Sequence, residues 1–327
     1  MKKKYNSAFS STEVLILLFF LSVLLIAFSY YLNFQKLKIR KIKQEDSSKK
    51  QIELCFNDFV DYFKTNISTE SDGPLDDIYS FVPDKKYNCS VNIVPLSGKL
   101  DINALPLDFF MQPYFLSLLK ENLDISFIED IKNKGKLLTS YGDLKEYITE
   151  EKFSETFCFL DMYNINTIDE SILSNLCELY GCFGDSVSKK HLLSVNKQYV
   201  KNETEADLYY GIDYSILKPH ITVEAPFNVN FMDAEFIASL VNLKRFDLVN
   251  SNQKVSELIS YRNKETLDKE SICNILGITN NNELYYYLGC KTYFWDVIVS
   301  CNNVICKFRI FRNEDQLYLI NKRWTKK

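Results

Sequence analysis

Glycine and histidine are scarce in this sequence. The 327-residue chain has 9 glycines and 2 histidines. With so few glycines it has no glycine-rich phosphate loop, and neither G-x-S-x-G nor H-E-x-x-H occurs. His191 and His220 lie far in sequence from any second group of metal ligands, and nothing places either of them beside a cysteine. We therefore predict that the protein is not an enzyme and has no catalytic residues and no metal site.

A strong positive charge is also missing. The net charge is -4 at pH 7, which leaves no basic surface of the kind that binds phosphates. The turn at Gly277 is compatible with a helix-hairpin-helix nucleic-acid module, but Asn280 to Glu283 bring no positive charge to it. A structural role for this turn is therefore favoured, and no nucleic-acid partner is expected.

One long apolar run lies near the start of the chain. From Val14 to Ala27 the only weakly polar residue is Ser22, and the apolar character continues to Phe34. A helix of roughly 20 residues crosses a bilayer core of about 30 Å, and residues 13–34 are long enough. A cleaved secretory signal and an uncleaved signal anchor are alternatives, but the aromatic end of the run suits an interfacial anchor better than a signal-peptidase site.

An acidic residue opens this run. Glu13 directly precedes Val14, and an unpaired carboxylate facing lipid near the edge of a span costs about 3 kcal/mol. A position at the water-accessible interface would remove that cost. The alternative is a functional acid that has a partner.

The residues around Glu13 resemble the leader of type IV prepilins and of type II secretion pseudopilins. In that family a short basic leader ends in a small residue, and an acid occupies the fifth position of the mature chain. Here Ala8 would precede the cut and Phe9 would be the new N-terminus. The resemblance implies that a membrane-embedded prepilin peptidase removes residues 1–8. Glu13 would then pair with the freed amino group of a neighbouring subunit, where the two opposite charges offset each other's desolvation. The family usually has glycine where this chain has Ala8.

Basic residues flank the apolar run on both sides, in Lys2 to Lys4 and again in Lys36 to Lys43. The positive-inside rule alone therefore leaves the orientation open. The prepilin resemblance implies a cytoplasmic N-terminus, a single span in the inner membrane and a large periplasmic domain. Nine cysteines in that compartment include at least one without a partner in the chain, and the sequence leaves open whether the others are buried thiols or disulfides.

The helical pattern continues beyond the apolar run. An apolar stripe at three- and four-residue spacing over residues 52–63 predicts that one helix runs on into the soluble body and stops near Asn66. Residues 87–95 alternate like a strand. Residues 294–299 and 304–310 alternate as well and are joined by Asn302-Asn303, which predicts a β-hairpin.

A short pattern occurs three times at nearly equal spacing. The copies begin at Asp101, Asn164 and Asn228, which lie 63 and 64 residues apart, and in each an Asn two positions later precedes a helix-like run. Asn side chains bond backbone groups at the end of an extended segment, and Asp169 and Asp233 are suited to cap the next helix. An Asn-rich composition produces such echoes by chance, but the shared apolar spacing of the second and third copies favours a modest repeat, too degenerate to predict a solenoid.

Several of these segments resemble the K-type minor pseudopilin of type II secretion systems. The resemblance involves residues 97–105, residues 164–176, residues 227–240, the helical hairpin of residues 255–278 and the closing strands of residues 292–324. It implies an α+β fold in which a long N-terminal transmembrane helix packs on an antiparallel sheet that a large, mostly helical inserted domain interrupts. The implied domains are a leader (1–8), a membrane-spanning part (9–34), the rest of the pilin helix with the first strands (35–103), the helical insertion (104–285) and the C-terminal strands (286–327).

The resemblance implies a non-catalytic minor pseudopilin at or near the tip of a pseudopilus, which supports protein export across the outer membrane. Its expected partners are the prepilin peptidase, the other minor pseudopilins, the major pseudopilin, the inner membrane and secreted cargo. K-type pseudopilins commonly lack the acid at the fifth mature position, so Glu13 leaves the tip and sub-tip positions both open. No cofactor is expected, and a structural calcium site of the family has no assignable ligands here. The alternatives are an uncleaved, membrane-anchored periplasmic binding protein and a minor pilin of a type IV pilus or competence system.

Overall fold

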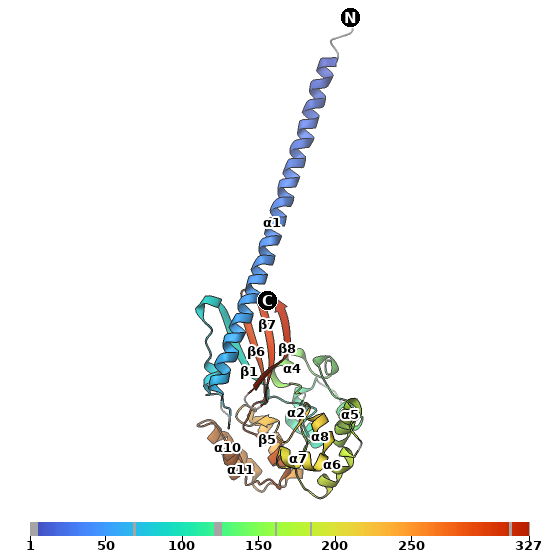
Figure 1. Ribbon diagram of the computed structural model, residues 1–327, viewed down its shortest axis with the longest axis vertical. Helices are drawn as coiled ribbons and strands as arrows, with labels where there is room; N and C mark the ends of the chain where they lie inside the picture. Colours follow the sequence, from blue (N-terminus) through green and yellow to red (C-terminus); the bar gives the residue numbers. More distant parts are fainter. Residues whose placement is uncertain are drawn as a thin grey trace.

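The structure is a computed structural model that describes residues 6–67, 70–120, 126–160, 162–183, 185–313 and 316–326, without the side chains of residues 6–12, 131 and 313. Its first element, α1 (Asn6–Asn66), is one continuous helix of 61 residues, about 90 Å long from the usual rise per residue. Figure 1 shows α1 projecting far beyond the body of the protein. The prediction that one helix continues from the apolar run into the body is confirmed.

A four-stranded antiparallel sheet packs against the C-terminal part of α1. Its strand order is β1-β6-β7-β8. The strands are β1 (Cys89–Pro95), β6 (Phe294–Cys301), β7 (Val304–Asn313) and β8 (Gln316–Lys326). β6 and β7 form the predicted hairpin, and Asn302 in its turn has a φ of 53°, in the left-handed region that Asn tolerates better than most residues. β1 and β6 are neighbours in the sheet although most of the helices lie between them in the chain.

The apolar stripe of α1 forms the core that joins the helix to the sheet. Its buried members are Ile52, Cys55, Phe56, Phe59 and Phe63. The Phe56 ring stacks on that of Phe308 in β7 at 3.8 Å between centroids, and Phe63 meets Trp295 in β6 edge to face at 4.8 Å. Burying a side chain of this size stabilises the folded state by roughly 1.5–3 kcal/mol. The stripe therefore fixes which face of α1 the sheet covers.

The chain between β1 and β6 is mostly helical and forms the lower part of the body in Figure 1. Its α-helices are α2 (Pro113–Leu118), α3 (Ser126–Asn133), α4 (Glu150–Thr156), α5 (Glu170–Tyr180), α6 (Ser186–Val195), α7 (Glu203–Tyr210), α8 (Ile212–Leu217), α9 (Ala234–Val241), α10 (Ser251–Arg262) and α11 (Lys269–Leu276). The protein therefore has an α+β fold with a long apolar N-terminal helix, an antiparallel sheet and a helical region.

The three echoes in the sequence adopt the same backbone turn. In each copy the side chain of the first residue accepts a hydrogen bond from the backbone N–H two residues later, at 2.9 Å from Asp101, 2.7 Å from Asn164 and 3.0 Å from Asn228. The backbone carbonyl of the same residue accepts from the N–H groups three and four residues on. An Asx turn of this kind redirects an extended chain into a helix. The three copies are therefore structural repeats as well as sequence echoes.

The Asn at the third position of each copy binds a distant part of its own unit. Asn103, Asn166 and Asn230 each exchange two hydrogen bonds with one backbone residue that lies 35, 34 and 37 residues further on. The partners are Leu138, Val200 and Leu267. All three Asn side chains are buried, and a side-chain amide that mimics a peptide group satisfies a backbone donor and acceptor that would otherwise be orphaned.

A parallel β-bridge closes each unit. Leu100 pairs with Phe157, β2 (Tyr163–Asn164) pairs with β3 (Ile221–Thr222), and β4 (Phe227–Asn228) pairs with β5 (Leu288–Gly289). We call these segments unit 1 (100–157), unit 2 (163–222) and unit 3 (227–289). Units 1 and 3 share one apolar core, whereas unit 2 has its own. The helical region is therefore a triplicated motif with two cores.

Two local expectations differ from the structure. The helix-like run of the first copy is split into a 3-10 helix (Leu107–Met111) and α2, because the residue before Pro113 is held in an extended conformation. Asp233 caps α9 as expected, accepting from the Glu235 N–H at 2.7 Å. Asp169 makes no such bond to α5 and instead accepts from Lys132 Nζ at 2.5 Å. Lys132 is 5% exposed, and a buried ammonium needs a counter-charge more than the helix needs a cap.

The pair of hydrogen bonds between the Asn side chain and the distant backbone residue can be tested in unit 2, where it joins Asn166 to Val200. Asn166→Ala removes both hydrogen bonds to Val200 and leaves a buried N–H and C=O without partners, a cost of about 3 kcal/mol. We expect the Val200 amide to exchange with deuterium about 100-fold faster in the variant, measured by exchange mass spectrometry. Asn196→Ala, at an exposed position of the same unit, is the control and should change the rate less than about twofold. Equal protection in both variants would contradict the role given to Asn166.

Candidate functional site

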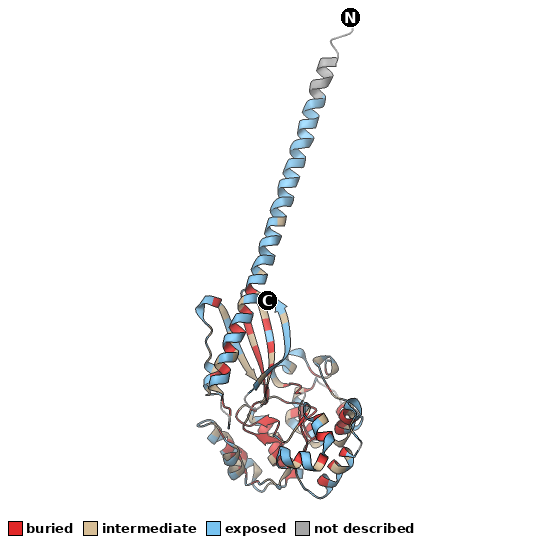
Figure 2. Ribbon diagram, in the orientation of Figure 1, coloured by how far each residue is buried: buried red, intermediate tan, exposed pale blue. Residues whose placement is uncertain are grey.

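The most unusual surface of the protein is the free part of α1. Every side chain from Val14 to Phe34 is exposed, and Figure 2 shows this part of the helix as uniformly exposed. Soluble monomers rarely expose contiguous apolar patches above a few hundred Å². Among the described residues, this is the one helix long and apolar enough to cross a membrane, a test that an N-terminal signal sequence also passes. The surface therefore needs lipid or other protein around it.

Glu13 lies at the N-terminal edge of this surface. Its side chain is exposed, and no ion pair to it is found among the described side chains. Ala8 and Phe9, the residues of the predicted cut, lie within α1, but their side chains are outside the described part of the chain. The site that the sequence predicts is therefore a helix end whose one acid is open to a partner from outside.

A basic segment marks the other edge of the apolar surface. Lys36, Lys38, Arg40, Lys41 and Lys43 are all exposed and lie around the helix directly after Phe34. Ammonium and guanidinium groups at this distance from a span reach the phosphates of the membrane surface. The packed part of α1 begins about one and a half helical turns after Lys43, with the buried Ser48. The helix thus passes from an apolar segment through a basic one to the sheet.

A buried acid in the segment after α1 joins the sheet to unit 3. Asp72, which is 0% exposed, accepts a hydrogen bond from the Thr292 N–H at 2.6 Å, and its carboxylate lies 3.6 Å from Arg312. Its backbone carbonyl accepts from Asn228 and Asn230 at 3.0 and 3.1 Å. Burial raises the pKa of Asp72 to about 6, against the opposing effects of the Thr292 N–H and Arg312. This role was not predictable from the sequence, because Asp72 lies in a polar stretch that indicates only the end of a helix.

Two buried lysines in the helical region have structural partners. Lys132 donates to the carbonyl of Leu105 at 2.5 Å, and Lys190 donates to that of Asn166. In unit 3 the guanidinium of Arg262 donates to the carbonyl of Val229 at 3.0 Å. Burial lowers the pKa of Lys190 to about 8. In each unit a cation from the second helix therefore satisfies carbonyls of the Asx turn, which accounts for these charges without a ligand.

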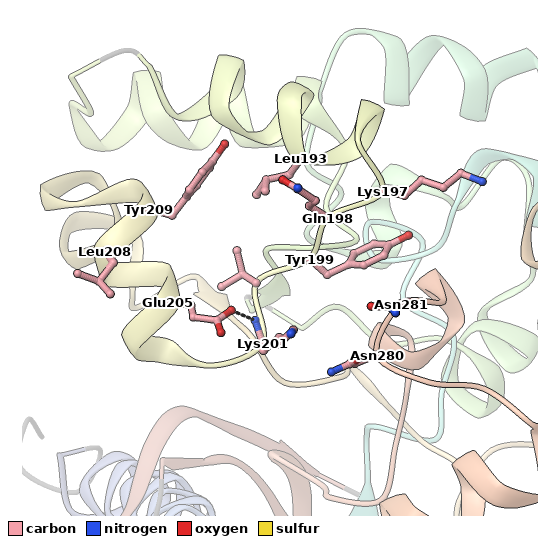
Figure 3. A pocket seen from close by; sticks show the side chains of 11 residues that line it. Leu193, Lys197, Gln198, Tyr199, Lys201, Glu205, Leu208, Tyr209, Asn280 and Asn281 are labelled. Carbon is pink, nitrogen blue, oxygen red and sulfur yellow. Dashed lines mark hydrogen bonds between the residues drawn. The ribbon is translucent and has the colours of Figure 1, made fainter.

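One hollow lies where unit 2 meets unit 3. It has a volume of about 490 Å³ and is lined by Leu193, Lys197, Gln198, Tyr199, Val200, Lys201, Glu205, Leu208, Tyr209, Asn280 and Asn281. Figure 3 shows these side chains around an open space, with Glu205 accepting from the Lys201 N–H at 2.8 Å. No described side chain of the lining pairs a nucleophile with a base. The lining of the hollow mixes polar and apolar side chains.

Neither histidine lines that hollow. His191 faces Glu170 at 3.1 Å on the exposed surface of unit 2, and His220 stacks on Tyr180 at 4.3 Å between ring centroids. Within the described ranges, no group of three or more His, Cys, Asp or Glu side chains is placed to hold a metal ion.

Comparison of the chain with family models and with curated proteins gives no match.

The buried carboxylate at the junction predicts a particular pH dependence. Because the folded-state pKa of Asp72 lies above its unfolded value of 3.8, the folded state holds its proton more tightly, and the free energy of unfolding falls as pH rises between about 4 and 6. Asp72→Asn removes this contribution. We expect the wild-type minus variant difference in the free energy of unfolding to fall by about 2 kcal/mol from pH 4 to pH 7, measured by urea unfolding of the detergent-solubilised chain through tryptophan fluorescence. A difference that rises with pH would mean that Arg312 outweighs burial.

Proposed function

We propose that the protein is a minor pseudopilin-like subunit of a type II secretion system, a non-catalytic component at or near the tip of a periplasmic pseudopilus. In this proposal α1 spans the inner membrane with its N-terminus in the cytoplasm, and the sheet and the three units lie in the periplasm. During assembly the apolar part of α1 leaves the lipid and packs against the helices of other subunits.

The observation that carries the proposal is the division of α1 into two parts. The C-terminal part of α1, which ends at Asn66, buries Phe56, Phe59 and Phe63 against the sheet. The part from Val14 to Phe34 is not covered by any other described part of the chain. A plain membrane anchor needs no rigid connection between its span and its domain. A subunit that is pulled from the membrane into a filament does, because the force on the domain passes through the helix. One unbroken helix of 61 residues is suited to that task.

Glu13 supports a filament over a plain anchor. An unpaired acid at the edge of a membrane span is costly, and an amino group exposed by cleavage after Ala8 would offset that cost on a neighbouring subunit. In this proposal the prepilin peptidase cuts between Ala8 and Phe9, and Glu13 sets the register of the subunit against its neighbour. The other proposed partners are the remaining minor pseudopilins, the major pseudopilin and secreted cargo.

The second candidate is a minor pilin of a type IV pilus or competence system, which uses the same leader and the same helix in a different machine. An uncleaved, membrane-anchored periplasmic binding protein is the third. Its distinguishing feature would be an exposed apolar helix that contacts lipid alone. The three differ in what surrounds α1, so the neighbours of α1 are the quantity to measure.

Glu13→Gln tests the role of the acid without changing the shape of the side chain. A photoreactive amino acid at Leu17, one turn from Glu13 on the same helix face, should cross-link wild-type chains to the helix of another pseudopilin in cells that contain the secretion machine. Loss of one member of a buried ion pair costs about 3 kcal/mol, so we expect the cross-linked fraction to fall more than tenfold in Glu13→Gln.

Asp46→Asn is the matched control, because it removes one exposed acid from the same helix outside the apolar segment. It should cross-link as the wild type does. Equal cross-linking in Glu13→Gln and wild type would remove the pairing from the proposal, and cross-links to lipid alone would favour the membrane-anchored binding protein.

A further inference from the structure

Three thiols meet at the end of the sheet where α1 leaves it. Cys55 lies on α1, Cys89 is the first residue of β1 and Cys301 is the last residue of β6. The Cys89 thiol lies close enough to the other two thiols that both contribute to raising its pKa. Cys301 also donates to Gln51 Oε1 on α1 at 3.0 Å. All three cysteines are free in the structure, so the cluster can form a covalent bond.

The strand register selects one pair from the three. Cys89 and Cys301 are direct partners in the antiparallel pairing of β1 with β6. Directly opposed residues in such a pair have Cα atoms about 4.5–5.5 Å apart, which lies within the range of about 4.4–6.8 Å that a disulfide spans. Cys55 reaches the cluster from the helix layer and has no strand partner to fix its distance. Bond formation between Cys89 and Cys301 therefore needs only a change of side-chain rotamers.

We propose that Cys89 and Cys301 form a disulfide in the native protein and that Cys55 remains a free thiol. The proposal rests on the periplasmic location of the sheet in the proposed function, because that compartment supplies disulfide-bearing thiol oxidoreductases. The bond would join the two strands between which the helical units are inserted. It would hold the register of β1 against β6 when force on α1 reaches the sheet.

The reaction is a thiol–disulfide exchange in two steps. The Cys89 thiolate attacks a sulfur of the donor disulfide, which forms a mixed disulfide and releases one donor thiolate. The Cys301 thiolate then attacks the Cys89 sulfur and releases the second donor thiolate. Two electrons pass to the donor disulfide, and the two protons of the cysteines end on the two donor thiols.

Exposure sets the order of these steps. Cys89 is half-buried, whereas Cys301 is 1% exposed and Cys55 is 0% exposed, so a donor from solution reaches Cys89 first. Burial raises the pKa of Cys89, with the neighbouring thiols adding to the effect, and raises that of Cys55 to about 11. Attack on a small donor at neutral pH is therefore slow and speeds up as the pH rises.

The test begins with the full chain purified in detergent, fully reduced and then brought to equilibrium with oxidised glutathione. Acid quenching, alkylation and peptide mass spectrometry then read each cysteine. We expect wild type to lose the alkylation labels at Cys89 and Cys301 and to yield the peptide that links them. Cys55→Ala is the control and should yield the same peptide. Cys301→Ser should stop at glutathione on Cys89, whereas Cys89→Ser should leave Cys301 alkylated.

Alkylation of both Cys89 and Cys301 in oxidised wild type, or a bond from either of them to Cys55, would overturn the proposal. This result needs no variant to fold. Rapid alkylation of intact cells that express the wild type separates the remaining outcomes. The linked peptide in cells supports the native disulfide, and free thiols in cells together with the bond in glutathione would overturn the periplasmic location instead of the geometry of the pair.

Discussion

The packing of α1 on the sheet is the interaction on which the rest of the structure depends. Phe56 stacks on Phe308 and Phe63 meets Trp295, so one face of the helix is committed to β6 and β7. Because the helix continues without a break towards the N-terminus, the same contacts fix the direction in which the apolar segment projects from the body. A helix that is rigid through the basic residues after Phe34 transmits displacement of its apolar end to the sheet. The proposed extraction from the membrane depends on this arrangement, and the proposed disulfide would hold the register of β1 against β6 under the same force.

The helical region depends on the sheet through its third unit. Asn228 and Asn230 belong to the Asx turn of unit 3 and also bind the carbonyl of Asp72, which is held in turn by Thr292 at the start of the closing strands. The first residue of the turn has other partners in units 1 and 2. Asp101 accepts a hydrogen bond from the Leu160 N–H, and Asn164 donates one to the carbonyl of Val223. A repeated turn has thus been adapted in one copy to join two parts of the molecule.

Local patterns in the sequence predicted local structure, but they did not predict contacts between residues that are distant in sequence. The stripe over residues 52–63 predicted the packed part of α1, Asn302-Asn303 predicted the β6–β7 hairpin, and the Asn steps predicted turns that lead into helices. A local pattern does not indicate which distant residue will be a partner. The hydrogen bonds between Asn166 and Val200 and the pairing of Cys89 with Cys301 were therefore not predictable. Asp169 was given the wrong partner for the same reason, since the buried Lys132 that binds it lies in another unit. The role of Glu13 remains a prediction, because its proposed partner is on another molecule.

The most direct test of the account is the mass of the mature N-terminus. The full chain is expressed with and without a prepilin peptidase, purified from membranes, and its N-terminal peptide is identified by mass spectrometry. We expect the chain to begin at Phe9 when the peptidase is present and to retain residues 1–8 when it is absent. A chain that keeps residues 1–8 in both cases would contradict the account, because Glu13 would then have no freed amino group to pair with and α1 would be an uncleaved anchor.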